Sequence, residues 1–216
     1  MKQLFFELLQ VSIGQRECLE RGPEPEEWQG LHELAQRQCV AGICYRGVER
    51  LFEFGLRAPQ DVSIDWMAEA EEMREQNEQS KKPSFLMRYY PEELRNLRQS
   101  SEEYYLQNKP MTIEDLYRLF LEQRLNMRAV IDYYFLLCQT ERRYETLKMG
   151  GVTDIFLGWF GIRRFARGLM WVLGETMGMD RSQMLCRPWG HEGRFILQEM
   201  LEGHQRMEMF KRYQRL

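Results

Sequence analysis

The strongest structural signal in the chain lies between Ile162 and Gly178. The apolar side chains of this stretch recur at intervals of three and four residues, which places them in one stripe along a helix. The stripe consists of Ile162, Phe165, Ala166, Leu169, Met170, Leu173 and Met177. Trp171 and Val172 widen the apolar face beyond a narrow seam. We therefore expect this helix to lie inside a bundle rather than on its surface.

Glycines mark both ends of this helix in the sequence. Gly161 is expected to interrupt the chain just before the helix begins. Gly178 is placed where a left-handed residue commonly ends a helix.

The rest of the sequence also favours helices. Helical periodicity recurs near residues 3–14, 25–39, 45–52, 60–79, 91–104, 112–121, 127–138 and 193–202. No sustained alternation of apolar and polar residues occurs, and residues 62–64 or 84–90 are expected to form at most a stray bridge. The sequence therefore predicts an all-α protein, an irregular multi-helix bundle of about seven to nine helices.

Two helix starts have specific local signals. Pro25 suits a first helical turn because that turn does not need its N–H, and Glu26 and Glu27 complement the helix dipole. Thr112 and Asp115 have the spacing of a capping box. Gly42 is expected to mark a joint before a third helix, whose face would include Phe52.

The best candidate for a boundary between regions is the stretch from Lys81 to Ser84. It follows a strongly charged helical half and contains a proline. We predict an N-terminal helical region over residues 1–82, a connecting segment over 83–111, and a C-terminal helical region over 112–216 that packs on the first.

Composition limits the class of protein. The 216 residues are 44% hydrophobic and 29% charged, which is typical of a soluble globular protein. The net charge of −3 argues against a nucleic-acid partner, because general polyanion binders are usually basic. No signal peptide and no apolar run long enough to cross a membrane is present. These features predict a cytoplasmic protein without a membrane partner.

The five cysteines also favour a cytoplasmic protein. Their number is odd and they form no C-x-x-C pair. They are Cys18, Cys39, Cys44, Cys138 and Cys186. Most lie on apolar helix faces, so we expect reduced, buried thiols.

Two blocks of the sequence resemble a bacterial family labelled uncharacterised nucleotidyltransferase. The first covers residues 5–52, with Phe5-Phe6-Glu7-Leu8-Leu9-Gln10-Val11-Ser12-Ile13-Gly14, Glu26-Glu27-Trp28 and Ala41-Gly42-Ile43-Cys44. The second covers residues 125–203, with Leu125-Asn126-Met127-Arg128, Asp132-Tyr133-Tyr134, Phe165-Ala166, Met170-Trp171-Val172-Leu173 and Glu192-Gly193-Arg194-Phe195. The blocks span well over half the chain in the family's order.

The resemblance implies a catalytic domain between the blocks, which this chain lacks. Such a domain would carry a glycine-rich turn for the triphosphate and a D-x-D pair for Mg²⁺. Residues 81–124 contain a single aspartate, Asp115, and no G-S or G-G step. The second block also departs from the family pattern, with Arg124 and Asn126 in place of its usual glycines.

Two groups of charged residues are candidate binding residues. Arg128 and Asp132 are four residues apart on one helix face, where a structural ion pair competes with a ligand-binding arginine. Arg163, Arg164 and Arg167 begin the central helix, where cations oppose the helix dipole. An acidic neighbour such as residues 69–78, a phosphate or nucleic-acid contact, or a partner protein would each explain them.

No catalytic or metal-binding residues are predicted. His32, His191 and His204 lack ligand spacing, and no serine or cysteine has the surroundings of a nucleophile. No cofactor is expected, and Mg²⁺ with a nucleoside triphosphate only if the chain takes part in nucleotidyl transfer.

Three functions remain open at this point. The first is a non-catalytic helical accessory or interaction protein, which would not be an enzyme and would have a protein partner carrying a catalytic domain. The alternative is a component of a nucleotidyltransferase whose catalytic residues come from another chain. A nucleotide site built from helices alone is the third.

Overall fold

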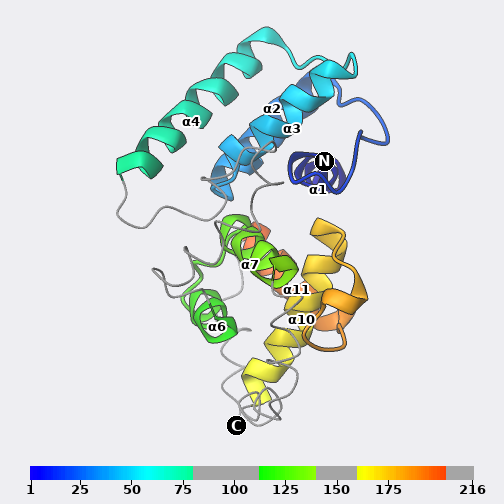
Figure 1. Cartoon of the computed structure of the whole chain (residues 1–216), viewed down its shortest axis with the longest axis vertical. Coiled ribbons are helices and arrows are strands. Elements are labelled where there is room, and N and C mark those ends of the chain that lie inside the picture. The colour runs from blue at the N-terminus through cyan, green and yellow to red at the C-terminus, as the bar shows by residue number, and fades with distance from the viewer. Residues whose placement is uncertain (80–111, 140–159, 203–216) are drawn as a thin grey trace. The chain divides into compact units, whose positions relative to one another are not determined.

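The computed structural model describes residues 1–79, 112–139 and 160–202 (Figure 1). The chain divides into two compact units, Met1–Lys109 and Pro110–Leu216. Each unit is described by itself below.

The described residues contain eight α-helices and one short 3₁₀ helix. They are α1 (Lys2–Ser12), α2 (Pro25–Arg37), α3 (Ala41–Glu53), α4 (Gln60–Gln79), α6 (Ile113–Leu121), α7 (Met127–Gln139), α10 (Phe160–Met177), η4 (Arg181–Gln183) and α11 (Gly190–Glu202). Over these ranges there is no strand, and residues 62–64 lie within α4. For this part of the chain, the predicted all-α class and number of helices are confirmed. The expected features at 84–90 and 91–104 lie outside the described residues.

The first unit is organised around α3, which contacts α1, α2 and α4. Gly47 allows α1 to approach closely, since a Cβ atom there would lie 2.9 Å from the carbonyl oxygen of Leu8. Trp28 and Trp66 bring the largest side chains into this core, from α2 and α4. The stretch before α3 differs from the prediction. The chain turns at Cys39, which has a φ of 56°, and Gly42 lies inside the first turn of α3.

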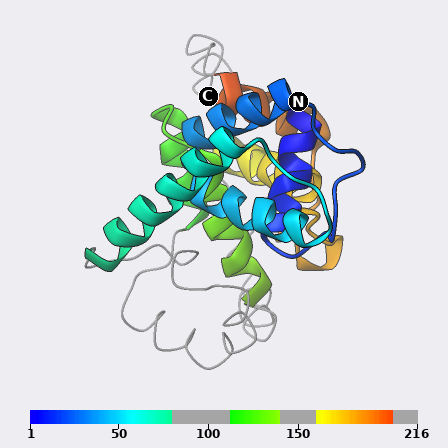
Figure 2. The same ribbon diagram turned by 90° about the horizontal axis from the view of Figure 1, so that it is seen from above.

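The second unit is organised around α10, the yellow helix in Figures 1 and 2, which contacts α6, α7 and α11. The predicted apolar stripe forms its buried face, with Phe165, Leu169 and Leu173 all 0% exposed. The ring of Phe165 lies 5.4 Å from Tyr117 and 5.2 Å from Phe120 on α6. The stripe therefore supplies the contacts that join the helices of this unit.

The ends of α10 and α11 test the predicted boundaries. Gly178 has a φ of 69°, and its N–H donates to the carbonyl of Gly174, so the predicted left-handed end is confirmed. The predicted break at Gly161 is wrong, because α10 already includes Phe160 and Gly161. α11 begins at Gly190, three residues before the start expected at residue 193.

Both predicted helix starts are present. The Thr112 hydroxyl accepts a hydrogen bond from the Asp115 N–H at 3.2 Å, and the Asp115 carboxylate accepts one from the Thr112 N–H at 3.1 Å. Pro25 opens α2, where Glu24 and Glu27 form a similar reciprocal cap.

The environments of the cysteines and of Phe52 differ from the predictions. All five thiols are free, but only Cys44 is buried, and burial raises its pKa. Cys18 and Cys39 are exposed, and so is Phe52, at 57%. Among the described helices, none combines the length and the apolar character that a membrane span requires.

Replacing Leu173 with alanine is expected to lower the free energy of unfolding by about 2–5 kcal/mol. The substitution removes a fully buried side chain from α10, the helix that contacts the other helices of the second unit. Urea denaturation followed by circular dichroism measures the loss. Ile64→Ala is the control. Ile64 is 53% exposed on α4, and its truncation is expected to change the free energy by less than about 0.5 kcal/mol. Equal losses in the two variants would show that the core is misassigned.

Candidate functional site

The three arginines predicted at the start of the central helix lie on α10 and have different environments. Arg163 is exposed, whereas Arg164 and Arg167 are partly buried. Arg128 and Asp132 lie on α7, and both are partly buried. No ion pair joins Arg128 to Asp132 among the described residues, and Asp132 has other interactions. The predicted group therefore separates into three arginines on α10 and two residues on α7.

Arg164 is paired with a buried carboxylate. Its Nε donates to Oε2 of Glu192 on α11 at 2.6 Å, and the two side chains are 30% and 0% exposed. Glu192 lies in the first turn of α11, where the helix dipole also favours negative charge. This acid, 28 residues away in sequence, offsets the unfavourable position of Arg164 near the start of α10. Glu69, from the acidic stretch considered as a neighbour, instead lies 3.2 Å from His32 in the first unit.

The pair depends on a close approach of α10 and α11. A Cβ atom at Gly168 would lie 2.6 Å from Cδ1 of Ile196 and 3.0 Å from Cγ of Glu192. At Gly193 it would lie 2.7 Å from Cδ2 of Trp171. Because larger residues would separate the helices at both points, these two glycines bring Glu192 within reach of Arg164.

Trp189 directly precedes α11, and its ring lies close to two of the arginines of α10. The guanidinium carbons of Arg164 and Arg167 lie 5.3 and 5.4 Å from its ring centroid, within the range of cation–π attraction. The backbone fixes this residue too, because the Trp189 N–H donates to the carbonyl of Arg167 at 2.9 Å. The side chain of Trp189 is 37% exposed, so the cluster reaches the surface.

Further arginines extend this surface. Arg163, Arg167 and Trp171 follow one another at intervals of four residues along α10, and the guanidinium carbon of Arg194 lies 5.8 Å from the Trp171 ring centroid. In the described part of the chain, no carboxylate forms an ion pair with Arg163 or Arg194. We call this surface the arginine face, and define it by Arg163, Arg164, Arg167, Trp171, Trp189 and Arg194.

The arginine face belongs to a basic part of an acidic chain. Residues 160–194 contain six arginines and three acidic residues, a formal surplus of three positive charges, whereas the whole chain has a net charge of −3. One of the three acids, Glu192, is already used by Arg164. The face can therefore attract anionic groups.

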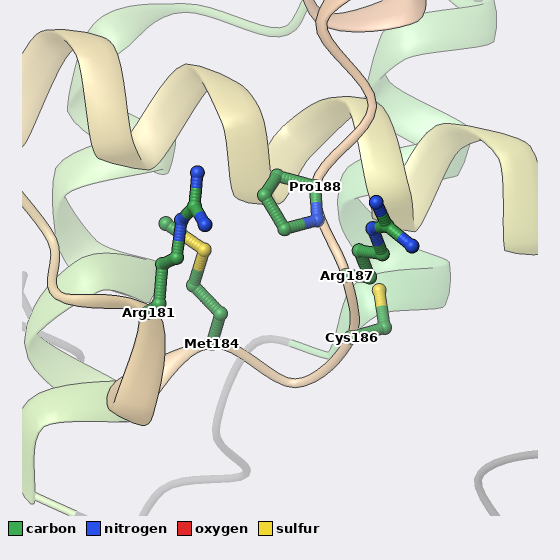
Figure 3. Close-up of a pocket in the computed structure, with 5 residues that line it drawn as sticks. All are labelled: Arg181, Met184, Cys186, Arg187 and Pro188. Atoms are coloured by element: carbon green, nitrogen blue, oxygen red, sulfur yellow. The ribbon is translucent and has the colours of Figure 1, made fainter.

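A pocket lies beside this face, in the segment that joins α10 to α11 (Figure 3). Its volume is about 430 Å³, and its lining residues are Arg181, Met184, Cys186, Arg187 and Pro188. Arg167 connects the pocket to the arginine face, because its Nε donates to the carbonyl oxygen of Arg187 at 3.2 Å.

The first unit contains a polar cluster that sequence spacing did not reveal. His32 is buried, and its ring centroid lies 5.2 Å from that of Trp66. The Glu69 carboxylate that lies near Nε2 of His32 accepts a hydrogen bond from Gln36. His32 and Glu69 lie on different helices, so only the pairing of α2 with α4 could have shown the contact. Over residues 1–79, 112–139 and 160–202, no group of three or more potential metal ligands occurs.

Comparison of the chain with protein-family models, with curated proteins and with solved structures finds no match. The resemblance to the nucleotidyltransferase family therefore stays a prediction.

Replacing Arg164 with alanine is expected to lower the free energy of unfolding by about 1–3 kcal/mol, because the buried Glu192 carboxylate loses a charged hydrogen-bond donor. Urea denaturation measures the effect, and Arg163→Ala is the matched control.

Arg163 is the neighbouring arginine on the same helix, but it is exposed and has no described acidic partner. Its loss is expected to change the free energy by less than about 0.5 kcal/mol. In the Arg164→Ala background, Glu192→Gln is expected to cost less than it does alone, because the two losses share one interaction. Additive losses would contradict the importance of the pair.

Proposed function

We propose that this chain is a non-catalytic helical interaction protein whose arginine face binds an acidic segment of a partner protein. The observation that supports the proposal is the local excess of arginine. Arg163 and Arg194 have no acidic partner among the described residues, and a buried carboxylate already engages Arg164.

Charge and shape favour a protein partner over a nucleic acid. Two guanidinium groups already lie close to the Trp189 ring, so less of the ring surface is available for stacking against a base. The chain also lacks the overall positive charge that supports binding along a phosphate backbone. Carboxylates that alternate with apolar residues would suit a face in which arginines alternate with tryptophans.

A fluorescein-labelled decaglutamate peptide is the probe for this proposal, with binding measured by fluorescence anisotropy. We expect saturable binding that weakens as NaCl rises, because exposed charges are screened by salt. The triple variant Arg163→Gln, Arg167→Gln, Arg194→Gln is expected to bind about tenfold more weakly, the equivalent of about 0.5 kcal/mol for each exposed contact.

The matched control removes three positive charges elsewhere. Arg21 and Arg118 are exposed and Arg46 is partly buried, and these three arginines already pair with Glu27, Asp115 and Glu49. Their triple glutamine variant is expected to bind the peptide as the original chain does. An equal loss in this control would mean that the peptide senses only net charge. Tighter binding of a ten-nucleotide single-stranded DNA through the same arginines would identify a nucleic-acid surface instead.

The proposal also predicts no nucleotide chemistry by the chain alone. Purified protein is expected neither to bind ATP, CTP, GTP or UTP in a manner that depends on Mg²⁺ nor to transfer a nucleotidyl group, because the sequence lacks the D-x-D pair that the resembled family uses for the metal. Isothermal titration calorimetry checks the first point. Micromolar binding that depends on Mg²⁺ would contradict it.

The second candidate is a nucleotidyltransferase component that works with a catalytic domain on another chain. It is favoured by the convergence of residues from the second family-like block. The Trp171 ring occupies the space that a Cβ atom at Gly193 would need, and Glu192 pairs with an arginine on α10. Mixing the chain with a separately encoded domain that has a Gly-Ser turn and a D-x-D pair would test this candidate, because transfer should appear only in the mixture.

A further inference from the structure

His32 is a buried residue of α2 that faces α4. Its side chain is 5% exposed, and the ring of Trp66, which is fully buried, lies 5.2 Å from it at an angle of 37°. The Glu69 carboxylate lies 3.2 Å from Nε2 of His32 and is 26% exposed. A side chain that can carry a charge is therefore enclosed by an aromatic ring and a carboxylate, and both belong to α4.

The contact between His32 and Glu69 has the distance of an ion pair but not the direction of a hydrogen bond. Among the described residues, Nε2 of His32 has no hydrogen-bond partner, although Oε1 of Glu69 lies 3.2 Å away. A neutral imidazole gains little from such a contact, since hydrogen bonds weaken steeply when they are misaligned. An imidazolium gains more, because Coulomb attraction depends on distance and not on alignment. The contact therefore favours the packing of α4 on α2 mainly when His32 carries a proton.

The surroundings of His32 act in two directions on that proton. Burial disfavours the charged ring, because the ring loses its hydration. The Glu69 carboxylate favours it, and so does Trp66, since a cation within about 6 Å of an indole ring is attracted to the face of the ring. Gln36, one turn along α2, donates to the same oxygen of Glu69 and holds that oxygen beside the imidazole. Glu69 thus offsets the effect of burial.

The other titratable groups on the helices packed against α2 have partners of their own or are neutral. On α3, Arg46 pairs with Glu49, and Arg50 donates to a backbone carbonyl. Cys44 on the same helix is buried, which raises its pKa and keeps the thiol neutral. On α1, the Glu7 carboxylate accepts a backbone N–H. The acids nearest the cluster in sequence are exposed, namely Glu33 on α2 and Asp65 and Glu72 on α4.

We propose that His32 and Glu69 form a proton-dependent ion pair that holds α4 against α2 in mildly acidic solution. In this arrangement, Glu69 is the counterion that allows a buried histidine to become charged without loosening the first unit. The inference does not depend on the arginine face, which lies in the second unit, so the acidic-peptide assay and the experiment below can succeed or fail separately.

Hydrogen exchange of the α4 amides, measured by mass spectrometry on the full chain, tests the proposal. The protection factor is used because it corrects for the effect of pH on the chemical exchange rate, and it reports local opening. The pH is lowered from about 8 to about 5.5, a range in which histidines ordinarily become charged and carboxylates stay ionised.

Glu69→Gln is the main variant, because Glu69 is only partly buried and glutamine keeps its shape. Without the negative charge, the effect of burial on His32 is no longer offset, so the unfolded chain binds the proton more readily than the folded unit does. Stability falls with pH wherever the unfolded state binds more protons. The loss of α4 protection relative to the original chain is therefore expected to be about tenfold larger at the lower pH than at the higher pH.

Glu49→Gln is the matched control. It removes an acid of the same unit whose partner, Arg46, stays charged at both pH values, so its effect on protection should not depend on pH. The amides of α10 provide an internal control in the second unit, and their protection should be the same in Glu69→Gln as in the original chain. A pH-dependent loss as large in Glu49→Gln as in Glu69→Gln would overturn the proposal, and so would a loss in Glu69→Gln that is equal at both pH values.

A second background identifies the group that takes up the proton. In a His32→Gln chain, Glu69→Gln is expected to lower α4 protection equally at both pH values, because no imidazole remains beside the carboxylate. A pH-dependent effect of Glu69→Gln that persists in this background would show that another group is responsible and would contradict the role of His32. If His32→Gln does not fold, the comparison of Glu69→Gln with Glu49→Gln still decides.

Discussion

The second unit depends on a carboxylate that has no contact with solvent. Burial of Glu192 is unfavourable by itself, because an isolated charge loses its hydration on leaving water. Arg164 and the first turn of α11 supply the compensation, and both require α10 and α11 to be close. The absence of side chains at Gly168 and Gly193 permits that distance. The ion pair, the two glycines and the Trp171 ring therefore form one structural arrangement, which holds the arginines of α10 at the surface beside α11.

The features that sequence predicted well are those whose causes lie within a few residues. The stripe on α10 follows from spacing alone, and the cap formed by Thr112 and Asp115 follows from two side chains three positions apart. Gly178 has the predicted left-handed backbone for the same kind of reason. Gly161 failed as a predicted break because glycine lowers helix propensity by only about 1 kcal/mol, which tertiary packing can outweigh.

The candidate site was only partly predictable because its contacts join distant residues. Sequence drew attention to Arg164 by its unfavourable position at a helix start, but the partner lies 28 residues away on another helix. Trp189, Arg187 and Arg181 had no local signal, since their importance arises only where the connecting segment folds back on α10. Periodicity also failed to determine which flank of a stripe is covered. Phe52 continues the pattern of α3, yet it is 57% exposed.

Net charge is the sequence property that most needs correction by the structure. A net charge of −3 describes how the whole chain interacts with a distant ion. At physiological salt, however, charges separated by more than about 8 Å are largely screened from each other. A partner that contacts residues 160–194 meets a surplus of three positive charges, and the acidic residues of the first unit contribute little when they lie beyond that distance. Among the acids of this segment, Glu192 faces Arg164 inside the protein and Asp180 bonds the Ser182 backbone. The arginines that remain exposed on this part of the chain therefore retain most of their attraction for an anion at contact distance.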